Sequence, residues 1–161
     1  MRVLLLRRHG VPAEAGRTPP TERAQVMSAN LDLVRSIYVD WDRGDFSHVE
    51  WAHPDIEYAI VEGPSPGTWT GLAEMRHAWR EFLSVWEDHR TEVEEYRELD
   101  AERVLVLVHF SGRGKASGLE AAQWGTTKGG ANVVHVRDGK VTRLVIYFDR
   151  ERAFADLGVA E

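Results

Sequence analysis

The sequence predicts a small α+β domain, a cone-shaped roll in which a curved, mixed or antiparallel sheet packs on three helices around an internal pocket. Helical spacing of apolar residues dominates the first half of the chain, and apolar segments joined by short turns dominate the second half. Strands that are grouped after helices favour an antiparallel sheet over the alternating parallel arrangement. Glycines placed between the segments can bend such a sheet, so that it wraps the helices.

Composition limits the classes of function. The 161 residues are 43% hydrophobic and 29% charged, which is typical of one globular domain. The net charge of −6 argues against a nucleic-acid partner or an anionic membrane surface, because both need a basic patch. The chain has no cysteine, which excludes disulfides and thiolate metal sites. We therefore expect a cytoplasmic protein with no metal, no cofactor and no membrane segment.

Residues 1–27 differ from the remainder of the sequence. A short apolar run is followed by a stretch rich in Pro, Gly, Ala and Arg, which predicts a loosely ordered extension. Within it, Arg8, His9 and Gly10 resemble the Arg-His-Gly motif of histidine phosphatases. That resemblance ends after about ten residues, and no alternation of strands and helices follows it. The sequence therefore disfavours a histidine phosphatase.

The first elements follow from helical periodicity and from capping residues. Ser28 is the expected N-cap of a helix over residues 28–43, which Gly44 ends. Asp45 is the expected cap of a short second helix that ends before Pro54. Residues 56–61 are predicted to form a strand. Residues 63–67, with two prolines and two glycines, are predicted to form a loop.

A further helix is expected over residues 71–87, where six apolar residues recur at helical spacing: Leu72, Met75, Trp79, Phe82, Leu83 and Trp86. Apolar segments at 91–99, 103–110 and 120–137 then predict three strands. Asp138 and Gly139 form the strongest hairpin signal in the chain and lead into a strand at 141–148. A terminal helix is expected after Asp149.

Several local strings occur in an order that is similar to the SnoaL-like branch of the nuclear transport factor 2 and ketosteroid isomerase superfamily. They are Arg43-Gly44-Asp45, His53-Pro54-Asp55, Trp69-Thr70-Gly71, Gly112-Arg113-Gly114 and Tyr147-Phe148-Asp149-Arg150. The resemblance covers about residues 28–159 and implies one such domain over residues 28–161. It also implies an apolar pocket between sheet and helices that carries one or two acid–base groups. The fold hosts isomerases, cyclases, epoxide hydrolases and non-enzymatic binders.

Three residues are candidates for catalysis. Asp149 stands where SnoaL-type cyclases carry a proposed general base, and the alternative is an N-cap of the terminal helix. His135 resembles the histidine partner of that aspartate, and the alternative is a strand residue that faces solvent or a second subunit. Glu62 falls near the catalytic carboxylate of ketosteroid isomerases, and the alternative is a solvated residue at a loop edge. A carboxylate in an apolar cavity has a raised pKa and is a better base.

Residues that could line the pocket are mostly aromatic. Tyr147 shares a strand face with Asp149 and could donate a hydrogen bond to a ligand. The other candidates are Tyr38, Trp41, Tyr58, Trp79, Trp86, His109 and Trp124. Such walls suit a flat aromatic or polycyclic ligand, and the alternative for each residue is ordinary core packing.

Two classes of function remain open. The first is a cofactor-independent isomerase or cyclase that uses carboxylate acid–base catalysis on a small hydrophobic molecule, with an epoxide hydrolase as a lesser variant. The second is a non-catalytic ligand-binding or accessory dimerisation domain with the same pocket. A homodimer is expected in either case.

Overall fold

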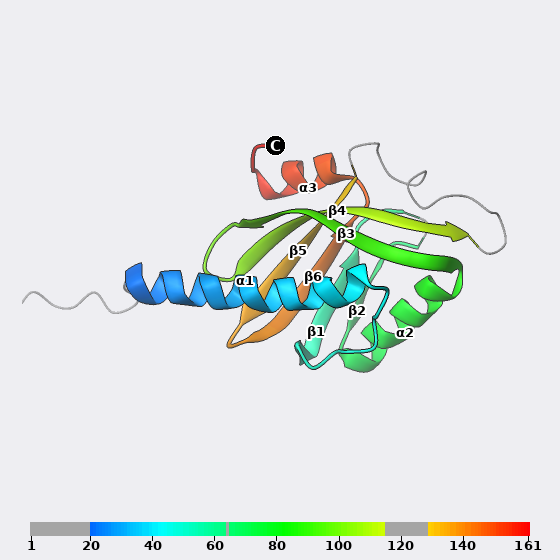
Figure 1. Ribbon diagram of the computed structural model, residues 1–161, viewed down its shortest axis with the longest axis horizontal. Helices are drawn as coiled ribbons and strands as arrows, with labels where there is room; N and C mark the ends of the chain where they lie inside the picture. Colours follow the sequence, from blue (N-terminus) through cyan, green and yellow to red (C-terminus); the bar gives the residue numbers. More distant parts are fainter. Residues whose placement is uncertain (1–19, 64, 115–128) are drawn as a thin grey trace, which may run out of the picture.

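The computed structural model describes residues 20–63, 65–114 and 129–161, which form three helices and six strands (Figure 1). The strand order β2-β1-β6-β5-β4-β3 makes one mixed sheet. Strands β1 and β6 run parallel, and the other neighbouring pairs run antiparallel. The predicted α+β class is confirmed. The elements are α1 Pro20–Asp42, β1 Ala52–Ile60, β2 Gly67–Thr70, α2 Leu72–Ser84, β3 Trp86–Glu98, β4 Arg103–Gly114, β5 Gly130–Arg137, β6 Lys140–Tyr147 and α3 Arg150–Leu157.

The sheet separates two hydrophobic clusters. Helices α1 and α2 lie against one face, here called the inner face, and α3 lies against the opposite, outer face (Figure 1). Because successive strand residues point to opposite faces, Val106 and Val108 of β4 belong to the inner cluster. Leu105 and Leu107 of the same strand belong to the outer cluster. Strand β4 therefore contributes to both clusters, as β1, β5 and β6 also do.

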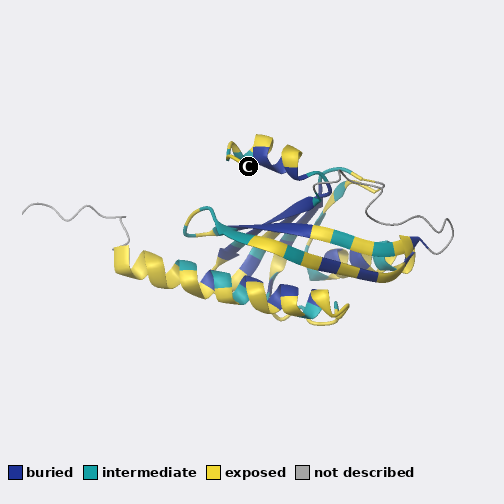
Figure 2. Cartoon of the chain, turned by 45° about the horizontal axis from the view of Figure 1, so that its top comes forward, coloured by how far each residue is buried: buried dark blue, intermediate teal, exposed yellow. Residues whose placement is uncertain are grey.

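Helix α1 begins eight residues earlier than the sequence predicts. It starts at Pro20, so Ser28 lies inside the helix and is not its N-cap. Residues 20–27 are helical, which corrects the expectation of a loose extension there, and residues 1–19 lie outside the described part of the chain. Residues 20–26 are all exposed (Figure 2), so they carry no apolar stripe that could reveal the helix.

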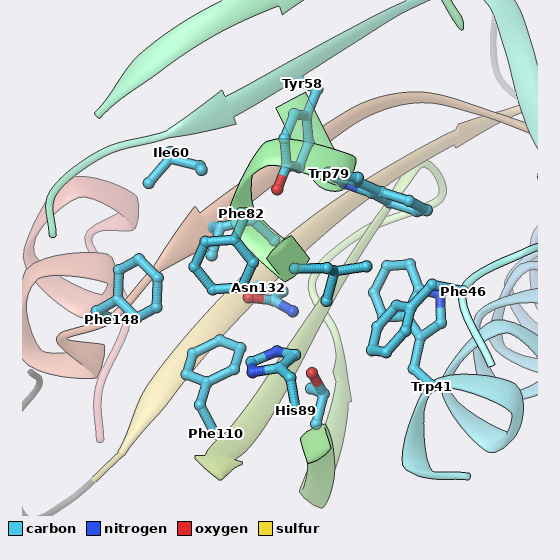
Figure 3. A pocket seen from close by; sticks show the side chains of 13 residues that line it. Trp41, Phe46, Tyr58, Ile60, Trp79, Phe82, His89, Phe110, Asn132 and Phe148 are labelled. Carbon is cyan, nitrogen blue, oxygen red and sulfur yellow. The ribbon is translucent and has the colours of Figure 1, made fainter. Parts of the chain in front are cut away.

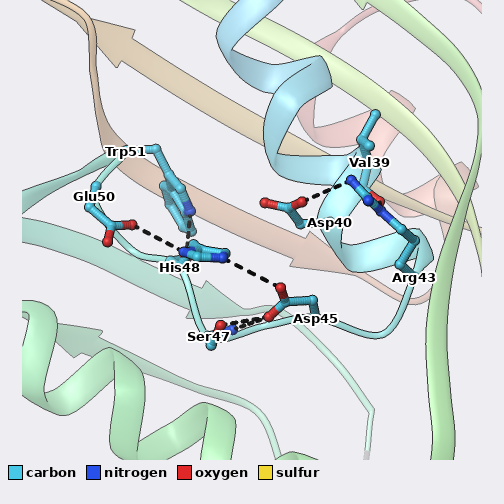
Figure 4. A network of polar contacts seen from close by, with 8 residues as sticks. All are labelled: Val39, Asp40, Arg43, Asp45, Ser47, His48, Glu50 and Trp51. Carbon is cyan, nitrogen blue, oxygen red and sulfur yellow. Dashed lines mark hydrogen bonds and ion pairs between the residues drawn. The ribbon is translucent and has the colours of Figure 1, made fainter.

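The short helix expected after Asp45 is not formed. One carboxylate oxygen of Asp45 accepts hydrogen bonds from the backbone N–H of Ser47, at 3.0 Å, and from its hydroxyl, at 2.6 Å (Figure 4). These bonds hold the pKa of Asp45 below its usual value and close a local turn in place of a helix cap. The indole N–H of Trp51 donates to the carbonyl of His48, at 2.9 Å, and braces the same irregular segment.

Strand boundaries also differ from the prediction around β2, β3 and β4. Helix α2 ends at Ser84, and β3 begins at Trp86 instead of residue 91. Trp86 therefore belongs to a strand, although its spacing from Phe82 also fits a helix. Strand β2 is a short edge strand that the sequence did not indicate, and β4 continues to Gly114. Of the strand expected over 120–137, residues 120–128 lie outside the described part of the chain.

The predicted hairpin at Asp138 and Gly139 is confirmed. Both residues have positive φ, 52° and 73°, as a two-residue type I′ turn requires, and Arg137 pairs with Lys140 across it.

Candidate functional site

A cavity lies on the inner face, between the sheet and the ends of α1 and α2 (Figure 3). Its open volume is about 50 Å³. Space of this size holds a few water molecules, whereas a cavity of roughly 150 Å³ accommodates benzene. The lining residues come from both helices, the segment between α1 and β1, and five strands or their ends: Trp41, Phe46, Tyr58, Ile60, Trp79, Phe82, Leu83, His89, Thr91, Phe110, Asn132, Ile146 and Phe148.

Aromatic rings form most of the wall. Trp79 of α2 stands at its centre, with its ring centroid 5.2 Å from Trp41, 5.9 Å from Tyr58 and 6.4 Å from Phe46. These three contacts are edge-on, an arrangement that the charge distribution of aromatic rings favours. A hydrogen bond also joins Trp79 to the Tyr58 hydroxyl, whose pKa burial raises. Ring contacts and this hydrogen bond therefore hold the side chains of the wall in place.

A bulge in β3 brings His89 into this wall. The pairing of β3 with β4 shifts between Glu87 and Arg90, and Asp88 in the bulge has a φ of 53°. Gly112 lies opposite, with a φ of 146°, and a Cβ there would approach the Cα of His89 to 3.2 Å. The bulge therefore depends on a glycine at 112. The imidazole packs against Phe82, at 5.1 Å, and Phe110, at 6.1 Å.

His89 is neutral at physiological pH. Its side chain is buried, with 9% of its surface exposed, and burial lowers its pKa to about 4. Within the described residues its Nδ1 has no hydrogen-bond partner. An imidazole in this state can accept or donate one hydrogen bond through that nitrogen, depending on the tautomer.

Asn132 supplies the second polar group of the cavity. It lies on β5 with 1% of its surface exposed, and its Nδ2 donates to the Tyr38 hydroxyl at 2.6 Å. Burial raises the pKa of Tyr38, so this hydroxyl stays protonated. The Oδ1 of Asn132 is buried and accepts no hydrogen bond from the described residues. Figure 3 shows the Asn132 amide and the His89 ring among Phe82, Phe110 and Phe148.

Four lining residues are partly exposed and form the rim of the cavity: Phe46, Phe82, Leu83 and Phe110. Two of them lie in the last turn of α2, and Phe46 lies in the irregular segment after α1. The side chains of these rim residues are only partly covered by other residues. The rim is where a ligand would enter.

The three residues proposed for catalysis lie outside this lining. Asp149 caps α3, because its Oδ1 accepts a hydrogen bond from the backbone N–H of Glu151 at 2.9 Å. Glu62 Oε1 accepts from the backbone N–H groups of Phe148, at 2.7 Å, and Asp149, at 3.0 Å, and so fixes the end of β6. His135 pairs with Arg143 on the outer face. The structure brings Glu62 next to Asp149, but it does not bring His135 to either of them.

Of the residues proposed for binding, Trp41, Tyr58 and Trp79 line the cavity, and Tyr38 supports Asn132 from behind. Trp86 is buried beside Phe82 without reaching the cavity.

The remaining candidates lie elsewhere. Tyr147 belongs to the outer cluster and its hydroxyl donates to Asp156 at 3.1 Å. His109 Nε2 is hydrogen-bonded to Glu94 Oε2 at 2.7 Å, away from the inner cavity. Trp124 lies outside the described residues.

Within the described part of the chain, the cavity lining contains no Asp, Glu, Lys or Arg. No group of His, Asp or Glu side chains that could hold a metal is found there either. The lining therefore offers contact surface for apolar rings and hydrogen-bonding atoms for uncharged polar groups.

His89 and Asn132 were not identified from the sequence. His89 lies in the charged run Glu87-Asp88-His89-Arg90, and only the bulge turns it inward. A signal for Asn132 exists, since an amide inside the run Ala131-Asn132-Val133-Val134 is unusual in a buried strand.

Comparison with known proteins agrees with this architecture. The sequence matches the family model described as a SnoaL-like domain over residues 34–144. No curated protein matches the sequence at a significant level. None of the described helices is long and apolar enough to cross a membrane.

Solved structures resemble the chain in fold. TerC, co-crystallised with polyporic acid, is 23% identical, with a TM-score of 0.61 over 80% of this chain and 97% of TerC. A putative polyketide cyclase from Sinorhizobium meliloti is 19% identical, with a TM-score of 0.53 over 71% of this chain and 93% of its own. A hypothetical protein with a ketosteroid isomerase-like fold from Catenulispora acidiphila, in complex with trimethylamine, is 12% identical, with a TM-score of 0.59 over 80% of this chain and 94% of its own.

Proposed function

The chain belongs to the family of SnoaL-like domains, and we propose that it binds a small aromatic molecule in the cavity of the inner face. One observation supports this most directly: the described lining is aromatic and apolar, with His89 and Asn132 as buried polar groups that each leave one atom without a partner. Pockets of this composition bind small molecules through apolar contact and a few polar groups. Two of the similar structures contain small molecules, polyporic acid and trimethylamine.

The size of the cavity limits the ligand. About 50 Å³ is less than a single ring requires, so the ligand displaces side chains as it enters. Phe46, Phe82 and Leu83 on the rim are the ones that can move with least loss of packing. A single-ring compound needs the smallest displacement, and a polycyclic ligand needs a larger opening of the α2 end.

Binding of toluene, followed by NMR, tests the proposal. We expect toluene to perturb amide signals of the inner face in the wild-type protein. Leu83→Trp places an indole at the rim and should abolish this response. Val85→Trp is the matched control, because Val85 is 51% exposed and lies outside the lining. A wild-type protein that responds to no single-ring compound, or a Leu83→Trp protein that responds unchanged, would contradict the proposal.

An isomerase or cyclase activity is the second candidate, and His89 is the observation that favours it. An unpartnered imidazole nitrogen in an aromatic cavity can position a substrate by a hydrogen bond, although a pKa of about 4 makes His89 a weak base. Asp149, Glu62 and His135 remain predicted catalytic residues from the family resemblance. For Asp149 and Glu62 to act, a substrate would have to bind at the end of β6 instead of in the cavity. Loss of substrate turnover in His89→Phe but not in Asp149→Asn would assign the chemistry to the cavity.

The homodimer expected from the sequence is also a proposal. The outer face of β1, β5 and β6 offers the surface for it, since α3 covers only part of that face. Sedimentation of the full chain gives its mass directly, and a monomer at micromolar concentration would contradict the dimer.

A further inference from the structure

We infer that the ligand of the inner cavity is uncharged and carries a hydrogen-bond donor that meets Asn132 Oδ1, as phenols, carboxamides and lactams do. This inference rests on the proposed function and names the chemical class of its ligand. It comes from the polar atoms of the cavity that the protein leaves without partners.

Asn132 requires a donor from outside the described protein. Its Nδ2 donates a hydrogen bond to the Tyr38 hydroxyl at 2.6 Å. Its Oδ1 is left buried, with no donor from the described residues. A buried carbonyl oxygen without a partner is destabilising, so such an atom is normally paired with protein, water or ligand. A ligand N–H or O–H placed in the cavity satisfies it.

His89 lines the same cavity and offers a second hydrogen-bonding atom to a ligand. Its Nδ1 is also buried without a partner, and the ring is held by contacts with Phe46, Phe82 and Phe110. Because the imidazole is neutral, it offers a hydrogen bond without a charge. A hydroxyl or a carboxamide has both donor and acceptor capacity and can use this nitrogen as well as Asn132.

The surroundings exclude an ionised ligand. Among the described lining residues none carries a charge that could compensate a carboxylate or an ammonium group. Moving an uncompensated charge from water into an apolar site is strongly unfavourable. The cavity therefore selects the neutral member of a chemically matched pair.

Two such pairs test the inference in the wild-type protein by isothermal titration calorimetry at pH 7. Toluene and phenol have nearly the same shape and differ by a hydroxyl donor. Benzoate and benzamide differ in charge. We expect phenol to bind about tenfold more tightly than toluene, and benzamide to bind at least about tenfold more tightly than benzoate.

Asn132→Leu replaces the amide by an apolar side chain of similar volume. The variant should still bind toluene, and its affinities for phenol and toluene should be about equal. Asn30→Leu is the matched control. Asn30 is also buried, but its Nδ2 donates to the carbonyl of Ala101 at 2.8 Å and it does not line the cavity. The control should keep the full preference. If Asn132→Leu does not fold, the side-chain amide signal of Asn132 in the wild-type protein replaces it, and should shift with phenol more than with toluene.

The outcomes separate the inference from the proposed function. Equal binding of phenol and toluene, or binding of benzoate as tight as that of benzamide, overturns the inference and leaves an aromatic binding site. Failure of all four compounds to bind overturns the proposed function itself.

Discussion

The two faces of the sheet differ in the charged side chains that they carry. On the inner face, the described cavity lining is aromatic and uncharged. On the outer face, Arg103 of β4 pairs with His135 of β5, His135 with Arg143 of β6, and Arg143 with Glu57 of β1. This ionic row crosses four neighbouring strands in register. Because side chains alternate along each strand, the same few strands build an apolar cavity and a charged surface.

One histidine on each face, His89 inside and His135 outside, illustrates the difference between the two environments. The pKa of His89 is lowered to about 4 by burial among rings. The pKa of His135 is also lowered, first by partial burial and then by the neighbouring guanidinium groups of Arg143 and Arg103. Burial is thus the first cause of the lowered pKa at both imidazoles, and the two guanidinium groups add to it only at His135. The described lining of the inner cavity holds no charged side chain, whereas the outer face places a guanidinium group on either side of His135 and pairs these groups with Glu57 and Asp100.

The largest expected effect comes from breaking the centre of the aromatic wall. Trp79→Ala should lower the free energy of unfolding by about 3–5 kcal/mol, since it removes a buried ring with several aromatic contacts. Added indole should restore part of this loss by filling the space. Phe154→Ala on α3 makes a comparable hole on the outer face. Urea denaturation with and without indole measures both, and recovery by indole in Phe154→Ala but not in Trp79→Ala would contradict the location of the cavity.

The second effect is a pH dependence due to His89. Its pKa is about 4 in the folded protein and about 6.5 when unfolded, so the unfolded chain binds a proton first as the pH falls. The free energy of unfolding should therefore decrease by about 3 kcal/mol between pH 6.5 and pH 4 because of this residue. His89→Phe should remove that part of the slope, while His77→Phe on the exposed side of α2 should keep it. Identical slopes in the two variants would show that His89 is solvated.

A smaller effect separates the end of β6 from the cavity. Asp149→Ala should lower the free energy of unfolding by about 1 kcal/mol, because α3 loses its N-cap, whereas Asp149→Asn keeps an acceptor and should change it by only a few tenths. Neither variant should alter the affinity for toluene or phenol, which calorimetry would measure. A large change in that affinity would place Asp149 at the ligand instead of at the helix.

The smallest effect concerns the ionic row. Arg143→Gln should raise the pKa of His135 toward its usual value, since one neighbouring positive charge is removed. The free energy of unfolding should change by less than about 0.5 kcal/mol at this partly exposed position. An NMR titration of His135 and His89 in the same sample provides the comparison. A shift at His89 and none at His135 would reverse the assignment of the two faces.

Local sequence signals predicted much of the fold. The hairpin at Asp138 and Gly139 was predictable because its turn needs two residues with positive φ. The start of α1 was not, because residues 20–26 are exposed and show no periodicity. The boundary between α2 and β3 was predicted wrongly because a periodic pattern continues across it. Phe82 and Trp86 fit the spacing of one helix, although a turn separates them.

The candidate site was less predictable than the fold. Trp41, Tyr58 and Trp79 were identified as possible wall residues from their spacing and type. His89 depends on a bulge that needs Gly112 on another strand, and such a pairing is not visible in a local pattern. Asn132 depends on which face of β5 is turned toward Tyr38. Polar residues that act through non-local contacts are the ones that periodicity does not find.

Mapping of phenol binding by NMR on the labelled full chain tests the central claim most directly. The account predicts that phenol shifts signals of inner-face residues, including the indole N–H of Trp79 and the side-chain amide of Asn132, and leaves Arg103, His135 and Arg143 unchanged. Shifts confined to the outer-face row, with Trp79 and Asn132 unaffected, would contradict it.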